Sequence, residues 1–372
     1  MFRALILGLM LALSPAVATA QGVTDGQIVL GQSVALTGPA EQLGKDMQFG
    51  ASLYFGAVNA KGGVNGRKIV LKTLDDGYES ARAAENTKKL IGEGVFALFG
   101  YVGTPTAAAS LPIFTEAKVP FVGPFTGAEL LRAPVNRYIF NVRASYYDET
   151  EAIVQHLTAM SVNKIAVFYQ NDAYGQAGLA GVERALKKRN LEVIAKGTVE
   201  RNTVEVAKSV ADLKAAQPQA IIMISAYKSC AAFIKSMKQA GGAATYWNVS
   251  FVGSKALAKE LDKEGRGVQI SQVVPFPWDS SVPVVKEYRA LLDAAKGEPG
   301  FGTLEGFIAA KVMVEGLRRA GKNLTRESFI KAMESLDPYD TGGFKVSYAP
   351  DNRSGSKFVD LTIISKDQKF VR

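Results

Sequence analysis

The sequence predicts an α/β fold of two lobes, each a mostly parallel sheet flanked by helices, joined by a three-stranded hinge. Short apolar strands alternate with amphipathic helices from residue 28 onward. The roughly 350 residues that follow the first twenty exceed what one core usually organises, so two domains are expected. Three segments interrupt the alternation and suit crossings between the lobes: Arg143–Asp148, Val274–Trp278 and Tyr348–Gly355. Two lobes joined in this way form a hinge with a cleft between them.

The first half of the chain alternates strand and helix down to the first predicted crossing. We expect strands at Ile28–Ala35, Lys68–Asp75, from Phe96, at Pro120–Val122 and at Tyr138–Asn141, and helices at Gln42–Lys61, Ser80–Glu93 and Thr106–Ala117. This order favours a parallel sheet with helical crossovers.

After the first crossing the same rhythm starts again. We expect helices at Tyr147–Met160, Tyr174–Lys188, Val204–Ala216 and Ser229–Ala240, and strands at Lys164–Gln170, Glu192–Lys196, Ala220–Ser225 and Thr245–Val249. Further helices are expected at Val282–Lys296, Thr303–Ala320 and Arg326–Leu336, and short strands within Gly342–Arg372. We therefore assign residues 21–144 and 275–348 to the first lobe, and residues 145–274 and 349–372 to the second.

The first twenty residues have the features of a secretory signal. Met1-Phe-Arg3 is a short positive segment, Ala4–Leu13 is an apolar run too short to span a bilayer, and Ala18-Thr-Ala20 is a cleavage pattern. No cysteine follows the apolar run, which excludes acylation of a mature N-terminal cysteine. We predict that residues 1–20 are removed and that the mature protein is periplasmic and soluble.

Composition excludes several classes of function. The net charge of +9 comes from scattered basic residues, and the densest cluster, Lys187–Arg189, suits a helix C-terminus better than nucleic acid. Cys230 and His156 are the single cysteine and histidine, so neither an intrachain disulfide nor a structural zinc site can form. His156 lies in a helical pattern, where a surface or packing role is expected.

Motifs for catalysis are missing from the sequence. There is no nucleophile elbow, phosphate-binding loop, His-Glu-x-x-His or Cys-x-x-Cys pattern, and Gly92–Ala97 precedes a strand where a dinucleotide fingerprint must follow one. Asp75 and Asp76 are paired carboxylates for which a catalytic or metal role stays open, although a solvated turn or a helix cap is favoured. We predict a binding protein rather than an enzyme, with no cofactor and no metal.

Two strand-loop-helix segments indicate the binding site. Phe96–Thr106 and Val119–Thr126 each run from an apolar strand into a loop rich in Gly, Pro and Thr. Thr104 suits an N-cap and Pro105 the first helical position. The free amides of that helix and its dipole attract a small anion, most simply a carboxylate. Ligands of such sheets bind beyond the carboxyl ends of the strands, so we expect a small-molecule cleft there.

Several motifs together identify a family. Leu36-Thr-Gly-Pro39 with Gly44, Asn59–Arg67, Leu74–Asp76 and Asp172–Gly175 stand where its markers stand. With them the chain resembles, over nearly all of its mature length, the type I periplasmic solute-binding proteins of ABC transporters, which include the leucine/isoleucine/valine-binding proteins. The resemblance implies a periplasmic binding protein-like I fold. It also implies a monomer that delivers its ligand to a membrane permease and an ATPase.

The resemblance assigns ligand-binding roles in the first lobe. Val102, Gly103 and Thr104 match the loop that holds the carboxylate of a bound amino acid. Phe125 and Thr126 match a second loop that adds backbone and hydroxyl contacts.

Other predicted contacts surround the body of the ligand. Tyr174 and Tyr227 match tyrosines of the second lobe, and Leu43 matches a residue that lines the side-chain pocket. Ser250 takes the position of a glutamate that pairs with the ligand ammonium in the family's amino-acid binders.

A serine at position 250 changes what the ligand can be. A hydroxyl cannot neutralise an ammonium, and an unpaired buried charge costs several kcal/mol. Either another acid takes over, with Asp148, Asp172 and Glu305 as candidates, or the ligand has no amine, which we favour. The predicted function is therefore the periplasmic substrate-binding component of an ABC importer for an amino acid or an aromatic or aliphatic organic acid. A ligand sensor that acts on a membrane receptor is the alternative, and an exported α/β enzyme is less favoured.

Overall fold

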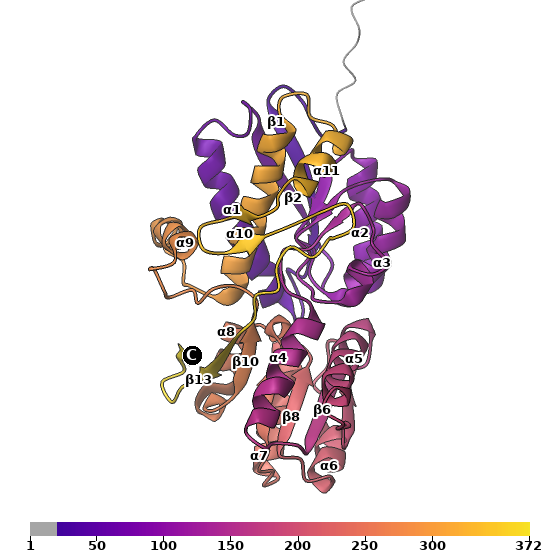
Figure 1. The fold of residues 1–372 in the computed structure, drawn as a ribbon, viewed down its shortest axis with the longest axis vertical. Coiled ribbons are helices and arrows are strands. Elements are labelled where there is room, and N and C mark those ends of the chain that lie inside the picture. Colours follow the sequence, from indigo (N-terminus) through magenta and orange to yellow (C-terminus); the bar gives the residue numbers. More distant parts are fainter. Residues whose placement is uncertain (1–20) are drawn as a thin grey trace, which may run out of the picture.

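The computed structural model describes residues 21–372 and arranges them in two lobes, one above the other in Figure 1. The predicted signal sequence, residues 1–20, lies outside the described residues. None of the helices found within 21–372 is long and apolar enough to cross a membrane. The predicted α/β class is confirmed, as are the two lobes with helices around mostly parallel sheets.

The sheet of the first lobe is parallel throughout, in the order β2-β1-β3-β4-β5. Its strands are β1 (Gln27–Val34), β2 (Lys68–Asp75), β3 (Ala97–Phe99), β4 (Phe121–Val122) and β5 (Ile139–Phe140). Strand β3 is buried along its whole length, because helices cover both faces of a parallel sheet. The carboxyl ends of these strands point toward the second lobe (Figure 1).

Six helices and one 3₁₀ turn complete the first lobe. They are α1 (Glu41–Ala60), α2 (Ser80–Gly92), α3 (Thr104–Glu116), η1 (Glu129–Leu131), α9 (Pro283–Ala294), α10 (Phe301–Ala320) and α11 (Arg326–Glu334). Helix α1 packs on α10 at very short range. A Cβ atom on Gly50 would lie 1.9 Å from the Thr303 carbonyl oxygen, and one on Gly306 would lie 2.4 Å from that of Met47. These glycines bring the first turns of α10 to the edge of the cleft.

The second sheet has the order β14-β13-β10-β9-β8-β6-β7. It contains β6 (Ile165–Gln170), β7 (Lys196–Val199), β8 (Ala220–Ile224), β9 (Thr245–Asn248), β10 (Gln269–Gln272), β13 (Asp360–Ile364) and β14 (Phe370–Val371). Its helical elements are α4 (Tyr146–Ala159), α5 (Ala173–Lys187), α6 (Ala207–Ala215), α7 (Tyr227–Gln239), η2 (Ser250–Val252), α8 (Ser254–Leu261) and η3 (Asp262–Gly265). Strands β6 to β10 are parallel, whereas β13 and β14 are antiparallel additions at one edge.

The three predicted crossings join the lobes. The third runs beside Asn141, just before the first crossing. The Asn141 backbone N–H donates to Arg353 O at 2.9 Å, and its carbonyl accepts from Gly355 N at 2.8 Å. The Tyr348 hydroxyl donates to the same carbonyl at 2.9 Å. The second crossing leaves β10 and leads to α9. A small antiparallel pair, β11 (Tyr339–Asp340) and β12 (Lys345–Val346), precedes the third crossing. The exact lobe boundaries stay a prediction.

One predicted strand is displaced along the chain. A strand was expected over Glu192–Lys196, but β7 begins only at Lys196. Gly197 and Val199 are the buried positions that face the core, whereas Ile194 is 42% exposed. The apolar residues before β7 therefore resemble a strand in sequence without being buried as one.

Replacing Asn141 with Ala should destabilise the hinge. Its buried side-chain amide donates to Leu131 O at 2.9 Å and to Arg353 O at 3.1 Å, and both bonds would be lost. We expect a loss of about 1–3 kcal/mol in the free energy of unfolding by urea. Tyr348→Phe, which removes a single bond, should cost less. Equal stability of Asn141→Ala and the wild type would contradict this account of the hinge.

Candidate functional site

The two loops predicted to hold a carboxylate lie against each other. Val102 forms an isolated parallel bridge with Phe125, and the Gly103 N–H donates to the Phe125 carbonyl at 3.2 Å. The hydroxyl oxygens of Thr104 and Thr126 are 2.7 Å apart, and both side chains are fully buried. The two loops therefore form one small cluster of hydroxyl and amide groups at the start of α3.

Gly103, not Thr104, is the N-cap of α3. Helix α3 begins at Thr104, and Gly103 has a φ of +105°, a conformation that glycine adopts easily. The predicted capping role of Thr104 is therefore wrong. Its hydroxyl makes no capping bond and turns instead to Thr126. Pro105 was expected at the first helical position and is instead the second residue of α3. A Cβ atom on Gly103 would lie only 2.3 Å from Cε2 of Tyr78, so the loop has no room for a side chain.

Aromatic side chains of the second lobe reach this cluster. Tyr146 lies between Thr126 and Tyr174. Its hydroxyl is 3.4 Å from the Thr126 hydroxyl, and its ring centre is 5.4 Å from that of Tyr174. Tyr174 is fully buried, and burial raises the pKa of its hydroxyl well above the usual value, so the hydroxyl stays protonated. This hydroxyl has no hydrogen-bond partner among the described residues.

Phe251, which the sequence analysis did not select, fills the space between the lobes. Its ring centre is 4.6 Å from that of Tyr174, 5.6 Å from that of Phe125 and 5.9 Å from that of Tyr78. Tyr78 comes from the first lobe, and its hydroxyl accepts from Gln170 of the second lobe at 3.2 Å. The sequence could not single out Phe251, because nothing in it distinguishes this residue from a core aromatic residue.

Leu43 and Tyr227 meet at the opening of the cleft. A Cβ atom on Gly253 would lie 2.5 Å from Leu43 and 3.5 Å from Tyr227, so both side chains pack around this glycine. Tyr227 begins α7 and is 3% exposed. It also lines a hollow of about 580 Å³ that opens to solvent between α1 and α8. We call this hollow the cleft mouth.

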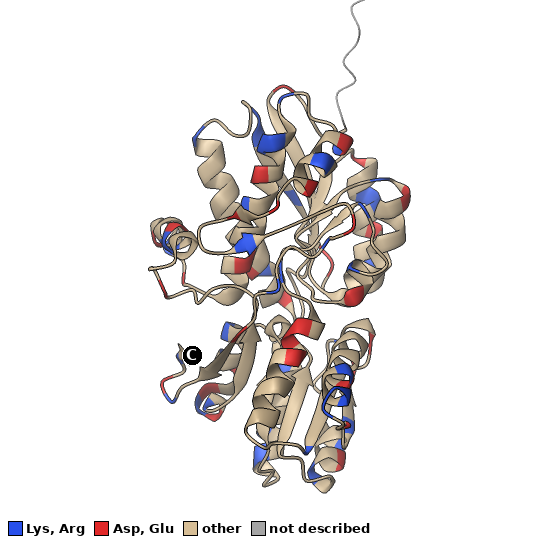
Figure 2. Ribbon diagram, viewed as in Figure 1, with Lys and Arg blue, Asp and Glu red and all other residues tan. Residues whose placement is uncertain are grey.

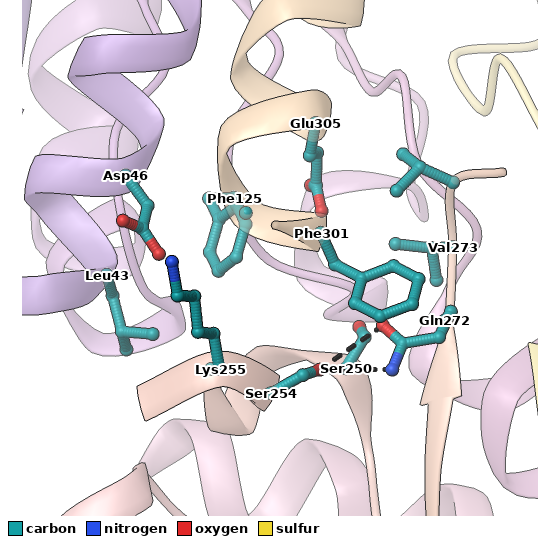
Figure 3. Close-up of a pocket in the computed structure, with 13 residues that line it drawn as sticks. Leu43, Asp46, Phe125, Ser250, Ser254, Lys255, Gln272, Val273, Phe301 and Glu305 are labelled. Atoms are coloured by element: carbon teal, nitrogen blue, oxygen red, sulfur yellow. Dashed lines mark hydrogen bonds between the residues drawn. The ribbon is translucent and has the colours of Figure 1, made fainter. Parts of the chain in front are cut away.

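The cavity deeper between the lobes is very small, about 10 Å³, which is room for about one water molecule. Figure 3 shows its walls. Of the predicted site residues, Leu43, Phe125 and Ser250 line it, and Asp46 and Glu305 of the first lobe line it too. In this arrangement of the lobes the cavity has no room for a larger molecule.

Ser250 lies in a buried ion-pair cluster built around Arg143. The Arg143 Nη2 donates to Glu149 Oε1 at 2.9 Å and to the Ser250 hydroxyl, and Nη1 lies 3.4 Å from Glu305 Oε1. The other oxygen of Glu149 accepts from the Ser250 N–H at 2.7 Å and from the Ser271 hydroxyl at 2.6 Å. All five residues are 7% exposed or less. We call Arg143, Glu149, Ser250 and Glu305 the Arg143 cluster.

Arg143 does not compensate the two carboxyl groups of this cluster equally. Burial alone lowers the pKa of Arg143, but attraction to Glu305 and Glu149 outweighs it and raises that pKa above its usual value, so Arg143 stays charged. Burial raises the pKa of Glu305 to about 7, with Arg143 lowering it and Glu149 raising it. Since Glu149 has the shorter bond to Arg143, Glu305 is the less well compensated carboxyl group.

The three acids proposed from the sequence to replace the family's glutamate, Asp148, Asp172 and Glu305, lie in different places. Asp148 caps α4 by accepting from the Ser145 N–H at 2.9 Å. Asp172 caps α5 and lies 3.4 Å from Arg201. Only Glu305 reaches the cavity beside Ser250. Sequence reasoning missed Arg143 and Glu149, although Arg143 begins the first predicted crossing.

Asp75 and Asp76 begin a turn, with side chains that accept from the N–H groups of Gly77 and Tyr78, but neither is the N-cap of α2. Asp76 is fully buried and accepts from the Ser33 hydroxyl at 2.7 Å, and burial raises its pKa to about 6. Asp75 accepts from the Thr37 hydroxyl at 2.6 Å. Burial opposes its ionisation, but the hydrogen bonds from Thr37 and from neighbouring amides outweigh burial and hold its pKa well below the usual value. The pair therefore braces the loops after β1 and β2, and Glu79 is the residue that precedes α2.

A second polar contact joins the lobes at the side of the cleft. Arg201 Nη2 donates to Glu79 Oε2 at 2.9 Å, and Asn202 Nδ2 donates to Glu79 Oε1 at 2.7 Å. Asn202 also donates to the Gly77 carbonyl at 3.1 Å. These bonds link the loop after β7 to the loop after β2. They hold the two lobes together independently of the Arg143 cluster.

The described part of the chain offers few side chains suited to metal binding or thiol chemistry. Residues 21–372 contain no group of three His, Cys, Asp or Glu side chains suited to a metal ion. His156 is exposed and packs near Trp247, with ring centres 5.3 Å apart, which confirms the surface or packing role. Cys230 is buried, and burial raises the pKa of its thiol. Basic and acidic residues are interspersed over both lobes in Figure 2.

Comparison with known proteins agrees with this architecture. Residues 27–367 match the family model described as periplasmic binding protein. The chain belongs to the periplasmic binding protein family. The Leu/Ile/Val-binding protein homolog 7 of Brucella abortus is 27% identical over 333 residues, which are 84% of this chain and 82% of that protein. The predicted likeness to the leucine/isoleucine/valine-binding group is thereby confirmed.

Solved structures agree over nearly the whole chain. A possible leucine/isoleucine/valine-binding protein from Rhodopirellula baltica is 34% identical, with a TM-score of 0.89 over 95% of this chain and 98% of that one. A substrate-binding periplasmic protein from Ralstonia solanacearum is 32% identical, with a TM-score of 0.88 over 93% of this chain and 99% of that one. The members of this family are binding proteins. The contacts of this chain's site residues with a ligand stay a prediction.

Replacing Gly103 with Ala should damage both the loop and the fold. The added methyl group would meet the Tyr78 ring, and the positive φ would be strained. We expect a loss of at least about 2 kcal/mol in the free energy of unfolding. Gly26→Ala is the matched control, because nothing lies within 4 Å of its Cβ position. A Gly103→Ala variant as stable as the Gly26→Ala variant would contradict this account.

The raised pKa of Glu305 should make stability depend on pH. The folded state holds this proton up to a pH of about 7, whereas the usual pKa is 4.5, so folding is favoured below pH 4.5 and that advantage is lost as pH rises to 7. Glu305→Gln should remove a decline on the order of 1–3 kcal/mol across this range, measured by urea unfolding at several pH values. The exposed Glu327→Gln should leave the decline unchanged. Parallel curves for wild type and Glu305→Gln would refute the assignment.

Proposed function

We propose that this chain is the substrate-binding component of an ABC importer and that it holds a small carboxylate-bearing ligand between two closing lobes. The observation that supports this most is the buried hydroxyl pair of Thr104 and Thr126 at the start of α3. Tyr146 connects this pair to Tyr174 of the second lobe, whose hydroxyl lacks a partner within residues 21–372. Hydroxyl donors from both lobes and the dipole of α3 suit a carboxylate group.

The other end of the ligand meets the Arg143 cluster. The Ser250 hydroxyl accepts from Arg143, so the position that would bind an ammonium already adjoins a buried cation. A ligand without an amine, such as an aromatic or aliphatic organic acid, therefore suits this end best. An amino acid is the second candidate, and it would need Glu305 in its ionised form to hold the ammonium.

The binding cycle needs only the hinge. The cavity of about 10 Å³ admits no ligand while the lobes touch, so they must open at the three crossings. The ligand enters by the cleft mouth and binds first to the loops of Thr104 and Thr126. Tyr174 and Tyr227 of the second lobe then complete the enclosure. Their contacts exist only in the closed form, so the ligand favours closure.

The family and the predicted secretory signal support a role in the periplasm. After loss of residues 1–20, the protein would act in the periplasm as a monomer and pass its ligand to a permease driven by an ATPase. Nucleic acid and cofactors have no part in this function, and neither does covalent catalysis. A sensor that presents its ligand to a membrane receptor is the alternative, since it would use the same closure.

A thermal-shift screen tests the proposed ligand class. It compares branched-chain amino acids with aromatic and aliphatic carboxylic acids, and with the amides of those acids. We expect acids without an amine to raise the unfolding temperature and their amides to have no effect. Stabilisation by leucine alone would contradict the ligand class, and no stabilisation by any carboxylate would contradict the function.

Replacing Thr104 with Ala should weaken binding of the ligand found in that screen. The loss of one charge-assisted hydrogen bond predicts a binding free energy lower by about 1–3 kcal/mol in calorimetry. Thr87→Ala, a buried threonine of the same lobe that bonds to Ser110 away from the cleft, is the control for general destabilisation. Unchanged affinity in the Thr104 variant would show that the carboxylate lies elsewhere.

Affinity should also depend on pH. Because the pKa of Glu305 is raised to about 7, this group becomes anionic as pH rises through 7 and then repels a simple carboxylate. We expect the affinity for an amine-free acid to fall between pH 6 and pH 8, on the order of tenfold, and Glu305→Gln to remove the decline. Affinity that rises over this interval would identify Glu305 as the acceptor of a ligand ammonium and would overturn the amine-free ligand.

A further inference from the structure

A second hollow adjoins the cleft mouth, beside the C-terminal segment and α8. It has a volume of about 560 Å³, within the range of about 300–1,000 Å³ that is typical of small-molecule sites. Three aromatic side chains form its wall, and it is bounded by one face of α8 and by the segment that leads into β14. We call it the aromatic hollow; its lining residues are Lys255, Ala258, Lys259, Phe276, Trp278, Gln368, Lys369 and Phe370.

The aromatic side chains of the wall pack against one another. Trp278 stacks on Phe370 with ring centres 5.7 Å apart and planes at 24°, and it lies 5.0 Å from Phe276. Phe301, at the start of α10, packs edge-on behind both Trp278 and Phe370, at 5.7 Å and 5.6 Å. On the other side, the Arg372 guanidinium lies 4.8 Å from the Phe276 ring centre. These contacts fix the orientation of Trp278, which is nevertheless 37% exposed.

The charged side chains that line the aromatic hollow are all basic. Its lining includes three lysines and no Asp or Glu. Lys255 pairs with Glu298, whereas Lys259 and Lys369 make no ion pair with any carboxylate in the described part of the chain. Arg372 is occupied by Asp279 and Asp360, each at 3.4 Å. Two ammonium groups are therefore left to attract an anion next to an apolar wall.

We propose that the aromatic hollow is a second ligand site, for a small carboxylate with an aryl or alkyl body. The body lies on Trp278 and Phe370, and the carboxylate binds Lys259 and Lys369. A flat aromatic wall provides contact area for a planar or extended apolar group. A lysine ammonium is a compact charge that suits a single anionic group on a ligand held mainly by apolar contact. Lys255 and Lys259 line both the aromatic hollow and the cleft mouth, whereas Trp278, Lys369 and Phe370 line the hollow and not the mouth. The proposal therefore does not rest on the importer function.

Trp278 provides a direct reporter of binding. The chain has two tryptophans, and Trp247 is fully buried in β9, so a Trp247→Phe variant leaves Trp278 as the single tryptophan. We would titrate this variant with 3-phenylpropanoate and with octanoate, and separately with their primary amides. The expected result is a saturable change in Trp278 emission with the acids and a dissociation constant about tenfold weaker with the amides.

Charge reversal tests the role of the lysines. Lys259→Glu with Lys369→Glu should weaken the acids about tenfold or more and leave the amides unchanged. Lys88→Glu with Lys214→Glu, two exposed positions away from the hollow, makes the same change in net charge and should have no effect. Equal binding of acids and amides, equal binding in both double variants, or no saturable change would each overturn the proposal.

A third variant separates this site from the cleft. Thr104→Ala is expected to weaken carboxylate binding in the cleft, whereas the Trp278 response should persist in that background. A Trp278 response that disappears with Thr104 would show that the acid binds only in the cleft and would refute a second site. A Trp278 response that persists, together with a thermal shift by the acids that Thr104→Ala leaves unchanged, would support the aromatic hollow and contradict the importer function instead.

Discussion

Arg143 lies where the first crossing enters the second lobe, and its guanidinium group contacts a carboxylate from each lobe. Glu149 belongs to α4 of the second lobe and Glu305 to α10 of the first, so the cation connects both halves across the cleft. A buried ion pair needs several hydrogen bonds to offset its loss of hydration. Ser250 and Ser271 supply them here. The shape of the cleft and the charge at its inner end both depend on this one arginine.

The cluster around Thr104 and Thr126 differs in chemistry from the Arg143 cluster. Neutral hydroxyl groups and a helix start meet at Thr104, and the positive φ of Gly103 lets the backbone approach closely. A carboxylate would suit this cluster because amides, hydroxyls and the helix dipole stabilise negative charge. The Arg143 guanidinium, 5.9 Å from the ring centre of Tyr146, adds positive charge nearby. We propose that the two clusters bind opposite ends of one polar ligand and so fix its direction. Between them, Phe251 and Tyr174 provide apolar contact from the second lobe.

Much of the architecture could be predicted from sequence, because alternating apolar segments fix a parallel α/β fold and Gly-Thr-Pro marks a helix start. The same reasoning selected the loops around Thr104 and Thr126, which do lie against each other, while their contact with a ligand stays a prediction. Arg143 and Glu149 were not, since a buried ion pair between a crossing and a helix has no local sequence pattern. Thr104 was given the wrong role because capping is assigned from residue type, whereas the φ of Gly103 decides where α3 begins. Tertiary contacts such as that of Phe251 lie beyond any local pattern.

The central claim is that the lobes move about the three crossings and close on a ligand. The most direct test is the distance between spin labels on Lys88→Cys in α2 and Lys214→Cys in α6, both exposed, with buried Cys230 replaced by Ser. Without ligand, the account predicts a broad or two-peaked distribution that includes an open form. The acid with the largest thermal shift should collapse it to one narrow peak. A distribution unchanged by saturating ligand would contradict the account.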